Sequence, residues 1–251
     1  MARGLNLPRA RFIRALIPEH NVMHLVIANK LYSSWSMRPW LVMRAVGLDF
    51  EETVIPLRQP DTAERIRRYS PSGKVPVLTD GDVKVWESLA IISYLADRFP
   101  DRPVWPEGRE ARAYAKSIAM EMHGGFQALR QACPMNLGKR FAAPAMTDDL
   151  KANIARVENI WRETRRRFSA GGSYLFGDQF TAADAMYAPV VARFYGYSIP
   201  VEPDTQAYMD AVYANPHVAR WRAEAFKEPW TVPAYEEGLT MIEDLKAKQN
   251  T

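Results

Sequence analysis

The 251-residue sequence predicts an α+β protein of two domains, in which an αβ domain precedes an all-helical one. Three observations predict this order. All segments with the pattern of a β-strand lie before residue 100, and residues 101–107 form a proline-containing linker. After the linker, apolar residues recur with helical spacing and no segment has the pattern of a strand. We therefore expect the first domain over residues 23–100 and the helical domain over residues 108–251.

Charge and hydropathy exclude several classes of protein. Four arginines and one glutamate in residues 1–22 account for +3 of the formal net charge of +4, so the rest of the chain is nearly neutral and nucleic-acid binding is not expected. We expect residues 1–22 to be an extension outside the fold. No uncharged apolar run approaches the roughly 20 residues that cross a bilayer. The single cysteine, Cys133, is expected to be a buried apolar residue of a cytoplasmic protein.

The first strand is expected over residues 25–28, and a turn rich in hydroxyl groups separates it from a helix. The first amides of a helix have no partner inside the helix, so this turn is a candidate anion site. Because proline is tolerated only in the first turn of a helix, Pro39 is expected there, with Ser36 as the N-cap. This leaves a hydroxyl of Ser33 or Ser34 free to face a ligand.

Three further strands are expected in the first domain. A strand over residues 50–57 completes a βαβ unit, whose two strands are parallel. The charged segment 61–69 is interpreted as a helix or a loop. Strands over residues 75–78 and 83–86 form a hairpin around the Asp-Gly pair at positions 80–81.

Two positions near this hairpin are candidate ligand contacts. Pro76 lies inside an apparent strand, and a cis peptide bond there would present the backbone of Val75 to a ligand. Glu87 and Ser88 open the next helix, whose N-terminus can hold a second anion. Ser88 can equally be the N-cap of that helix and nothing more.

In the second domain, five segments carry helical spacing of apolar residues: 109–130, 148–168, 182–195, 205–214 and 218–226. Four motifs along the chain, YSSWSMRPW, SPSGKVPVL, ESLAIISYL and FGDQFTAADAMYAP, together resemble the cytosolic glutathione transferases. The likeness extends from about residue 25 to residue 221 and is nearest to bacterial, serine-type members of the theta- and zeta-like group.

The resemblance implies a thioredoxin-like βαβαββα domain that binds glutathione, followed by an all-α helical-bundle domain that supplies most of the second-substrate pocket. It implies a homodimer that uses glutathione as a co-substrate, with no cofactor and no metal. The implied reaction is conjugation of the glutathione thiolate to a small hydrophobic electrophile. A glutathione-dependent isomerase or dehalogenase of the zeta type, and a non-catalytic binding protein with the same fold, are the alternatives.

The resemblance also implies the residues that meet the thiol. The zeta pattern points to Ser33 and the theta spacing points to Ser34, and both remain candidates. Trp35 stands where the zeta motif has its cysteine, which counts against the zeta isomerase reaction. Thr181 and Asp184 match the helix-capping box of the family, a structural pair in which each side chain bonds to the backbone of the other.

For the rest of glutathione, the resemblance implies two groups of contacts. Lys74 and Val75 precede the proline that is cis in the family, Pro76, and the backbone of Val75 is expected to pair with the cysteinyl backbone of glutathione. Glu87 and Ser88 are expected to bind its γ-glutamyl end.

The second-substrate pocket is expected to involve the first long helix of the helical domain. His123, Phe126 and Arg130 lie three and four residues apart, beside two glycines that would let a ligand approach the backbone. The same spacing is equally compatible with Phe126 in the core and Arg130 paired with an acid.

Overall fold

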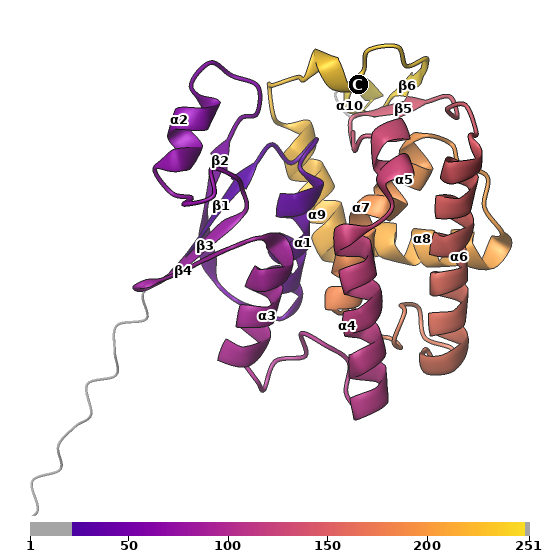
Figure 1. Cartoon of the computed structure of the whole chain (residues 1–251), viewed down its shortest axis with the longest axis horizontal. Coiled ribbons are helices and arrows are strands. Elements are labelled where there is room, and N and C mark those ends of the chain that lie inside the picture. Colours follow the sequence, from indigo (N-terminus) through magenta and orange to yellow (C-terminus); the bar gives the residue numbers. More distant parts are fainter. Residues whose placement is uncertain (1–21, 249–251) are drawn as a thin grey trace, which may run out of the picture.

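The sheet domain has the order of elements that the sequence predicts. The computed structural model describes residues 22–248, so all but the last residue of the predicted extension lies outside the described residues. The elements are β1 (Met23–Ala28), α1 (Ser34–Ala45), β2 (Phe50–Ile55), α2 (Thr62–Arg67), β3 (Val77–Asp80), β4 (Val83–Trp86) and α3 (Ser88–Arg98). This is the predicted βαβαββα order (Figure 1).

The four strands form one mixed sheet in the order β2-β1-β3-β4, in which β1 and β2 are parallel and the other pairs are antiparallel. Successive side chains of a strand point to opposite faces. Val26 accordingly packs with Ile66 of α2 on one face, whereas Leu25 and Ile27 join the main core on the other. Because β1 is central, the turn at its carboxyl end lies in the middle of the molecule.

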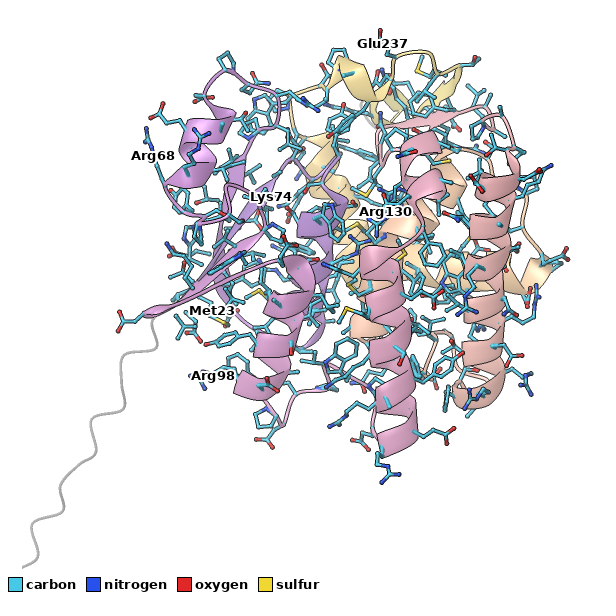
Figure 2. All side chains as sticks on the ribbon, in the orientation of Figure 1. Met23, Arg68, Lys74, Arg98, Arg130 and Glu237 are labelled. Carbon is cyan, nitrogen blue, oxygen red and sulfur yellow. The ribbon has the colours of Figure 1, made fainter. Side chains whose placement is uncertain are left out.

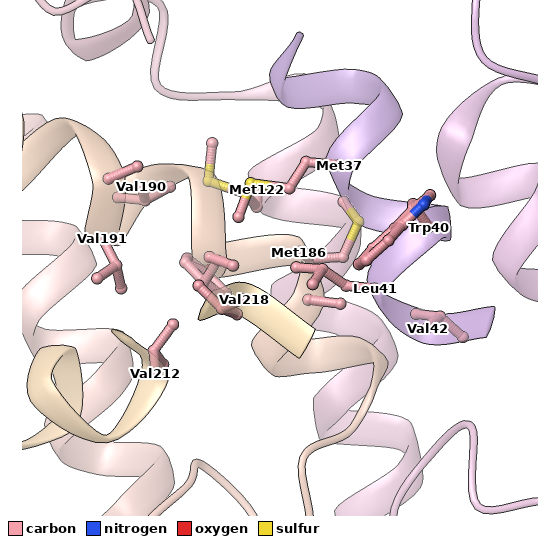
Figure 3. Packing of buried hydrophobic residues seen from close by; sticks show 14 of the residues in the cluster. Met37, Trp40, Leu41, Val42, Met122, Met186, Val190, Val191, Val212 and Val218 are labelled. Carbon is pink, nitrogen blue, oxygen red and sulfur yellow. The ribbon is translucent and has the colours of Figure 1, made fainter. Parts of the chain in front are cut away.

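Helices dominate the second part of the chain: α4 (Arg109–Gly124), α5 (Gln127–Ala132), α6 (Asp148–Phe168), α7 (Ala182–Gly196), α8 (Pro203–Ala214) and α9 (Pro216–Phe226). The central helix α7 is buried over nearly its whole length and packs against α1 and α4. Figure 3 shows Met37 and Leu41 of α1 near Met122 of α4 and Met186 of α7. The predicted fold class is therefore confirmed, and one core joins the sheet to the helices.

The expected single helix over residues 109–130 is wrong, because the chain breaks it into α4 and α5. A Cβ atom at Gly125 would lie 2.8 Å from the carbonyl oxygen of Glu121, and the next residue, Phe126, has a left-handed backbone with φ of 62°. The glycine permits this close approach of the backbone. As a result, His123 and Arg130 lie on different helices instead of one face of the same helix.

The expectation that no strand follows residue 100 is also wrong. Strands β5 (Lys139–Phe141) and β6 (Met241–Asp244) form a small antiparallel sheet, accompanied by the 3-10 turn η1 (Pro233–Tyr235) and α10 (Leu245–Lys248). Strands of three and four residues are too short to show a reliable period in the sequence. The sheet is fixed by long-range contacts, including an ion pair of 3.0 Å between Arg140 and Glu243.

The predicted capping box at the start of α7 is confirmed. One carboxylate oxygen of Asp184 accepts the backbone N–H of Thr181 at 2.9 Å and its hydroxyl at 3.0 Å, and the other accepts the N–H of Leu175 at 3.1 Å. These bonds anchor the buried start of α7. Within the described part of the chain, no helix is both long enough and apolar enough to cross a membrane.

Candidate functional site

The serine turn, residues 32–36, follows β1 and contains the N-cap and the first residues of α1. Ser33 is the N-cap of α1: its Oγ accepts the N–H of Ser36 at 3.3 Å, and its hydroxyl donates to Oγ of Ser36 at 2.8 Å. Oγ of Ser36 also accepts the N–H of Ala28, the last residue of β1, at 3.1 Å. The prediction that Ser36 caps the helix is therefore wrong. Ser36 is fully buried and joins the end of β1 to the first turn of α1.

The prediction for Pro39 is wrong as well, because this proline lies inside α1 and not in its first turn. An N–H at this position would bond to the carbonyl of Trp35, four residues earlier. The proline therefore removes one hydrogen bond close to the start of the helix. The start of α1 is set by the cap at Ser33, three residues earlier than Ser36.

The two adjacent hydroxyls of the turn have different surroundings. The proton of Ser33 is donated to Ser36. Oγ of Ser34 accepts a long hydrogen bond of 3.5 Å from Nη2 of Arg193 on α7, and no described residue accepts the proton of Ser34. Of the two serines, Ser34 is therefore the one with a proton available for a ligand.

A polar cavity of about 220 Å³ reaches the turn at Trp35, whereas Ser33 and Ser34 are buried and are not among its lining residues. It is bounded by a cis peptide bond between Val75 and Pro76. The cavity contains four of the predicted glutathione contacts, and its lining residues are Trp35, Ser72, Lys74, Val75, Pro76, Glu87 and His123. Figure 2 shows Lys74 on the sheet side of the molecule and Arg130 on the helical side.

The pair Glu87 and Ser88 stands at the start of α3. Glu87 occupies the N-cap position with φ of 72°, a backbone region that residues with side chains rarely adopt, and Ser88 is the first helical residue. The suggestion that Ser88 is the N-cap is therefore wrong. Its buried hydroxyl has no hydrogen-bond partner among the described residues. A positive φ such as that of Glu87 is maintained only where the surrounding structure holds the backbone in place, and it occurs frequently at ligand sites.

A second, mainly apolar cavity of about 350 Å³ lies between α3 and α4. Glu87 and His123 line both cavities, so they stand at the boundary between them. The other residues around the second cavity are Leu89, Ala90, Ser93, Trp105, Lys116 and Met120. Phe126 belongs to the hydrophobic core and lines neither cavity.

Trp35 brings several of these groups together. The guanidinium carbon of Arg38 lies 4.5 Å from the centre of its ring, and that of Arg130 lies 4.7 Å from it. The ring of His123 packs edge-on at 5.1 Å. Burial, followed by the charge of Arg38, lowers the pKa of His123, whereas Glu87 acts in the opposite direction. The imidazole is therefore neutral at pH 7.

Comparison with known proteins places this geometry in a family. One family model, the N-terminal domain of glutathione S-transferases, matches residues 32–98, and a second, the C-terminal domain of the same proteins, matches residues 140–224. The chain belongs to the glutathione S-transferase family. The first match contains the serine turn and both predicted groups of glutathione contacts, and the second contains α7.

Two curated members of the glutathione S-transferase family illustrate the similarity. Glutathione S-transferase Z2 of Arabidopsis thaliana is 29% identical over 185 residues, which cover 69% of this chain and 80% of that protein. A probable maleylacetoacetate isomerase of Caenorhabditis elegans is 29% identical over 186 residues, with coverage of 69% and 82%. A solved glutathione transferase homolog from Burkholderia, with bound glutathione, has a TM-score of 0.62 at 22% identity and covers 81% of this chain and 98% of that one, which shows the shared fold.

Several features near the turn were not expected from the sequence: Trp35 and Ser72 as walls of the polar cavity, and Arg38 and Arg193 as buried charges. A signal for Arg193 was present, because α7 is apolar on all sides and such a helix is buried, so that a cation within it is buried too. No comparable signal marked Arg38, which lies in a helix of mixed polarity. Residues 22–248 contain no group of three histidine, cysteine or acidic side chains that could hold a metal ion.

Proposed function

We propose that this transferase holds glutathione in the polar cavity, stabilises its thiolate at the serine turn, and transfers the sulfur to a small electrophile. The observation that supports this best is the position of the turn. The helix that begins at these serines contributes Trp35, the residue after Ser34, to the wall of a cavity that also contains the cis Val75–Pro76 bond, Lys74 and Glu87. The relatives named as glutathione S-transferases support the same reaction.

The cavity residues divide the binding of glutathione among them. The backbone of Val75 pairs with the cysteinyl backbone, and the carboxylate of Glu87 meets the γ-glutamyl ammonium. The start of α3, at Ser88, faces the γ-glutamyl carboxylate, because helix N-termini favour negative charge. Lys74 contributes a positive charge near the anionic tripeptide. These contacts hold the sulfur at the turn.

The turn must supply enough free energy to stabilise the thiolate relative to the neutral thiol at pH 7. A free thiol has a pKa of about 8.5, and a pKa of about 6.5 requires roughly 2.7 kcal/mol of preferential stabilisation of the anion. A helix N-terminus supplies about 0.3 to 1 kcal/mol and a hydrogen bond to a charged group about 1.5 to 3 kcal/mol. Together they approach the requirement. Ser34 is the donor that the hydrogen bonds favour, since the proton of Ser33 is directed to Ser36.

The reaction itself is a displacement or an addition. In both, the proton of the thiol leaves to solvent and the sulfur forms a bond to the electrophilic carbon. In a displacement, a leaving group departs with the electron pair of its bond; in an addition, the electron pair of the double bond shifts to the neighbouring atom, which takes up a proton from solvent. The serine does not act as a nucleophile. The apolar lining of the 350 Å³ cavity favours a small hydrophobic electrophile.

A zeta-type isomerase is the second candidate function, because relatives from Caenorhabditis elegans and rat are named as maleylacetoacetate isomerases. In that reaction glutathione adds to the substrate and is released again. Trp35 occupies the position of the cysteine in the zeta motif, which favours conjugation. Loss of one glutathione for each substrate molecule indicates conjugation, and unchanged glutathione indicates isomerisation.

We also propose a cytoplasmic homodimer. Val83 and Trp86 on the edge strand β4 are 45% and 42% exposed, and Met120 on α4 is 61% exposed. Large exposed apolar side chains beside a strand edge mark candidate interfaces. Sedimentation velocity of the wild type and of Trp86→Lys tests this interface, because a dimer that uses it should dissociate in the variant. A monomeric wild type contradicts the proposal.

The proposed function is tested with purified full-length protein. Calorimetry measures glutathione binding, and the ultraviolet absorbance of the thiolate gives the pKa of the bound thiol. A chlorinated nitrobenzene serves as the first electrophile for turnover. Failure to bind glutathione, together with failure to consume it with this or any other standard electrophile, refutes the proposal.

A further inference from the structure

Three arginines from three helices gather behind the serine turn: Arg38 of α1, Arg130 of α5 and Arg193 of α7. Arg38 and Arg193 are buried, with exposed fractions of 0% and 5%. Burial, followed by repulsion from the other two guanidiniums, lowers the pKa of Arg38. Burial, followed by repulsion from Arg130, lowers the pKa of Arg193. The three charges are therefore close enough to interact.

Among the described residues, this arginine cluster has no carboxylate as a counter-charge. None of its members forms an ion pair with a carboxylate within residues 22–248. Nη2 of Arg38 and Nε of Arg193 are buried and have no hydrogen-bond partner among the described residues. The other guanidinium nitrogens mostly meet backbone carbonyl oxygens, namely those of Met186 and Ser34 for Arg38, Pro189 for Arg193, and Met122, His123 and Gly125 for Arg130.

The neighbouring groups that could ionise do not supply this charge. Burial raises the pKa of Cys133 to about 12 and raises the pKa of Tyr187 and Tyr197 well above neutrality, so all three are uncharged at pH 7. Burial lowers the pKa of Arg193 to about 10, which leaves it protonated at pH 7. A buried charge without a counter-ion is costly. An anion brought by a ligand would remove that cost.

We infer that the thiolate of glutathione is the counter-ion of the arginine cluster, and that Arg193 is a positioning residue that holds Ser34 for this thiolate. The inference rests on the proposed function. Nη2 of Arg193 donates to Oγ of Ser34 at 3.5 Å, so the serine proton must point away from the guanidinium. A hydroxyl that accepts from a cation is also a stronger donor to its own acceptor. Arg193 thus acts on the sulfur through Ser34, from the other domain of the protein.

Other charged and titratable groups, namely Lys74 before β3, Glu87 at the start of α3 and His123 on α4, line the polar cavity, whose lining does not include the three arginines. Glu87 is assigned to the ammonium of glutathione. Burial, followed by the charge of Arg38, lowers the pKa of His123 despite the opposing effect of Glu87. Removal of Arg193 leaves all three in place. A change in thiol ionisation in an Arg193 variant therefore reports on the guanidinium.

The test compares Arg193→Met with the wild type, because methionine keeps much of the length and removes the charge. Titration of the thiolate absorbance of bound glutathione should show a pKa higher by about one to two units, as is typical when one nearby opposite charge is removed. Arg193→Lys should give an intermediate value. The control, Arg162→Met, removes an exposed arginine that pairs with Asp204 at 3.1 Å and should leave the thiol unchanged.

Two further measurements separate this role from a merely structural one. Arg193→Met should bind S-methylglutathione, which has no ionisable thiol, as tightly as the wild type does, while glutathione binding at pH 7 weakens. Without glutathione, the variant should resist urea at least as well as the wild type, because a buried unpaired charge is gone. Arg193→Gln replaces the methionine variant if that variant does not fold.

The inference is overturned if the thiol pKa in Arg193→Met equals that of the wild type, or if the variant loses as much affinity for S-methylglutathione as for glutathione. A wild type that does not bind glutathione refutes the proposed function. A wild type that binds it with a lowered thiol pKa, beside an Arg193→Met variant with the same thiol pKa, refutes only the role of Arg193.

Discussion

Separate alanine substitutions of Ser33 and Ser34 should distinguish the residue that caps the helix from the residue that binds the thiolate. In Ser33→Ala, the N–H of Ser36 loses its acceptor and Oγ of Ser36 loses a donor. Loss of an N-cap hydroxyl typically costs about 1 kcal/mol of folding free energy. Ser34 is the first helical residue and has no capping bond, so Ser34→Ala should change stability less.

For the pKa of the thiol, the expected order of the two variants is reversed, and Ser34→Ala should have the larger effect. A hydrogen bond to a charged group is worth about 1.5 to 3 kcal/mol, which at 1.36 kcal/mol per unit corresponds to a rise of about one to two units in the thiol pKa of Ser34→Ala. From a starting pKa of about 6.5, the thiolate fraction at pH 7 would fall by about 3- to 25-fold, and turnover limited by the thiolate should fall with it. Ser33→Ala should move the thiol pKa by less.

Urea unfolding measures the first effect and titration of the thiolate absorbance measures the second. Ser117→Ala serves as a control, because Ser117 lies on α4 and its hydroxyl bonds only to the carbonyl of Ala113, one turn earlier. If Ser33→Ala raises the thiol pKa while Ser34→Ala does not, the assignment of the donor is wrong. If neither variant raises it, stabilisation by a serine hydroxyl is refuted.

Three other substitutions test the surrounding structure. Lys30→Met should destabilise the protein by about 1.5 to 3 kcal/mol in urea unfolding, because its buried ammonium pairs with Glu52 and, at 2.5 Å, with Glu224; the two carboxylates keep the N–H of Trp40 and the guanidinium of Arg220 as partners. Gly125→Ala should destabilise it by about 1 to 3 kcal/mol, since the new Cβ would lie 2.8 Å from the carbonyl oxygen of Glu121, and equal stability would contradict the close approach. Because the pKa of His123 is lowered in the folded protein, this histidine is protonated more readily in the unfolded chain as the pH falls through about 6.5, and this difference lowers the stability of the fold. His123→Gln should therefore lose less stability than the wild type between pH 7.5 and pH 5.5, and an unchanged pH profile would refute this.

The elements of the sheet domain were predictable because their signals are local. A short apolar run, an Asp-Gly hairpin turn and a glycine at the end of a helix each act within a few residues. One parallel crossover and one hairpin account for the neighbours β1–β2 and β3–β4, whereas the pairing of β1 with β3, which completes the order β2-β1-β3-β4, is a long-range contact. The break after α4 depends on a contact between the Gly125 backbone and the preceding turn, and the helical spacing of the apolar residues continues across it.

The start of α1 shows why the site itself was harder to predict. Ser33, Ser34 and Ser36 are all acceptable N-cap residues, and the preference of proline for the first helical turn favoured Ser36. In the structure, Ser36 is occupied by Ala28 of β1, and Ser33 caps the helix in its place. The choice among three serines is thus made by the strand that packs beside them.

The arginine cluster was harder still to predict, because its members are separated by up to 155 positions in the sequence, from Arg38 to Arg193. In the sequence, Arg38 and Arg130 resemble ordinary surface charges, and the apolar surroundings of Arg193 indicate its burial but not its neighbours. Only the packing of α1 and α7 against each other, with α5 beside them, reveals charges without carboxylate partners next to Ser34. A folded protein retains such charges at a cost in stability, and the cost is recovered when a bound anion pairs with them. The proposed pairing of the thiolate with the arginine cluster therefore predicts that glutathione binding and the stability of the interface between the two domains are coupled.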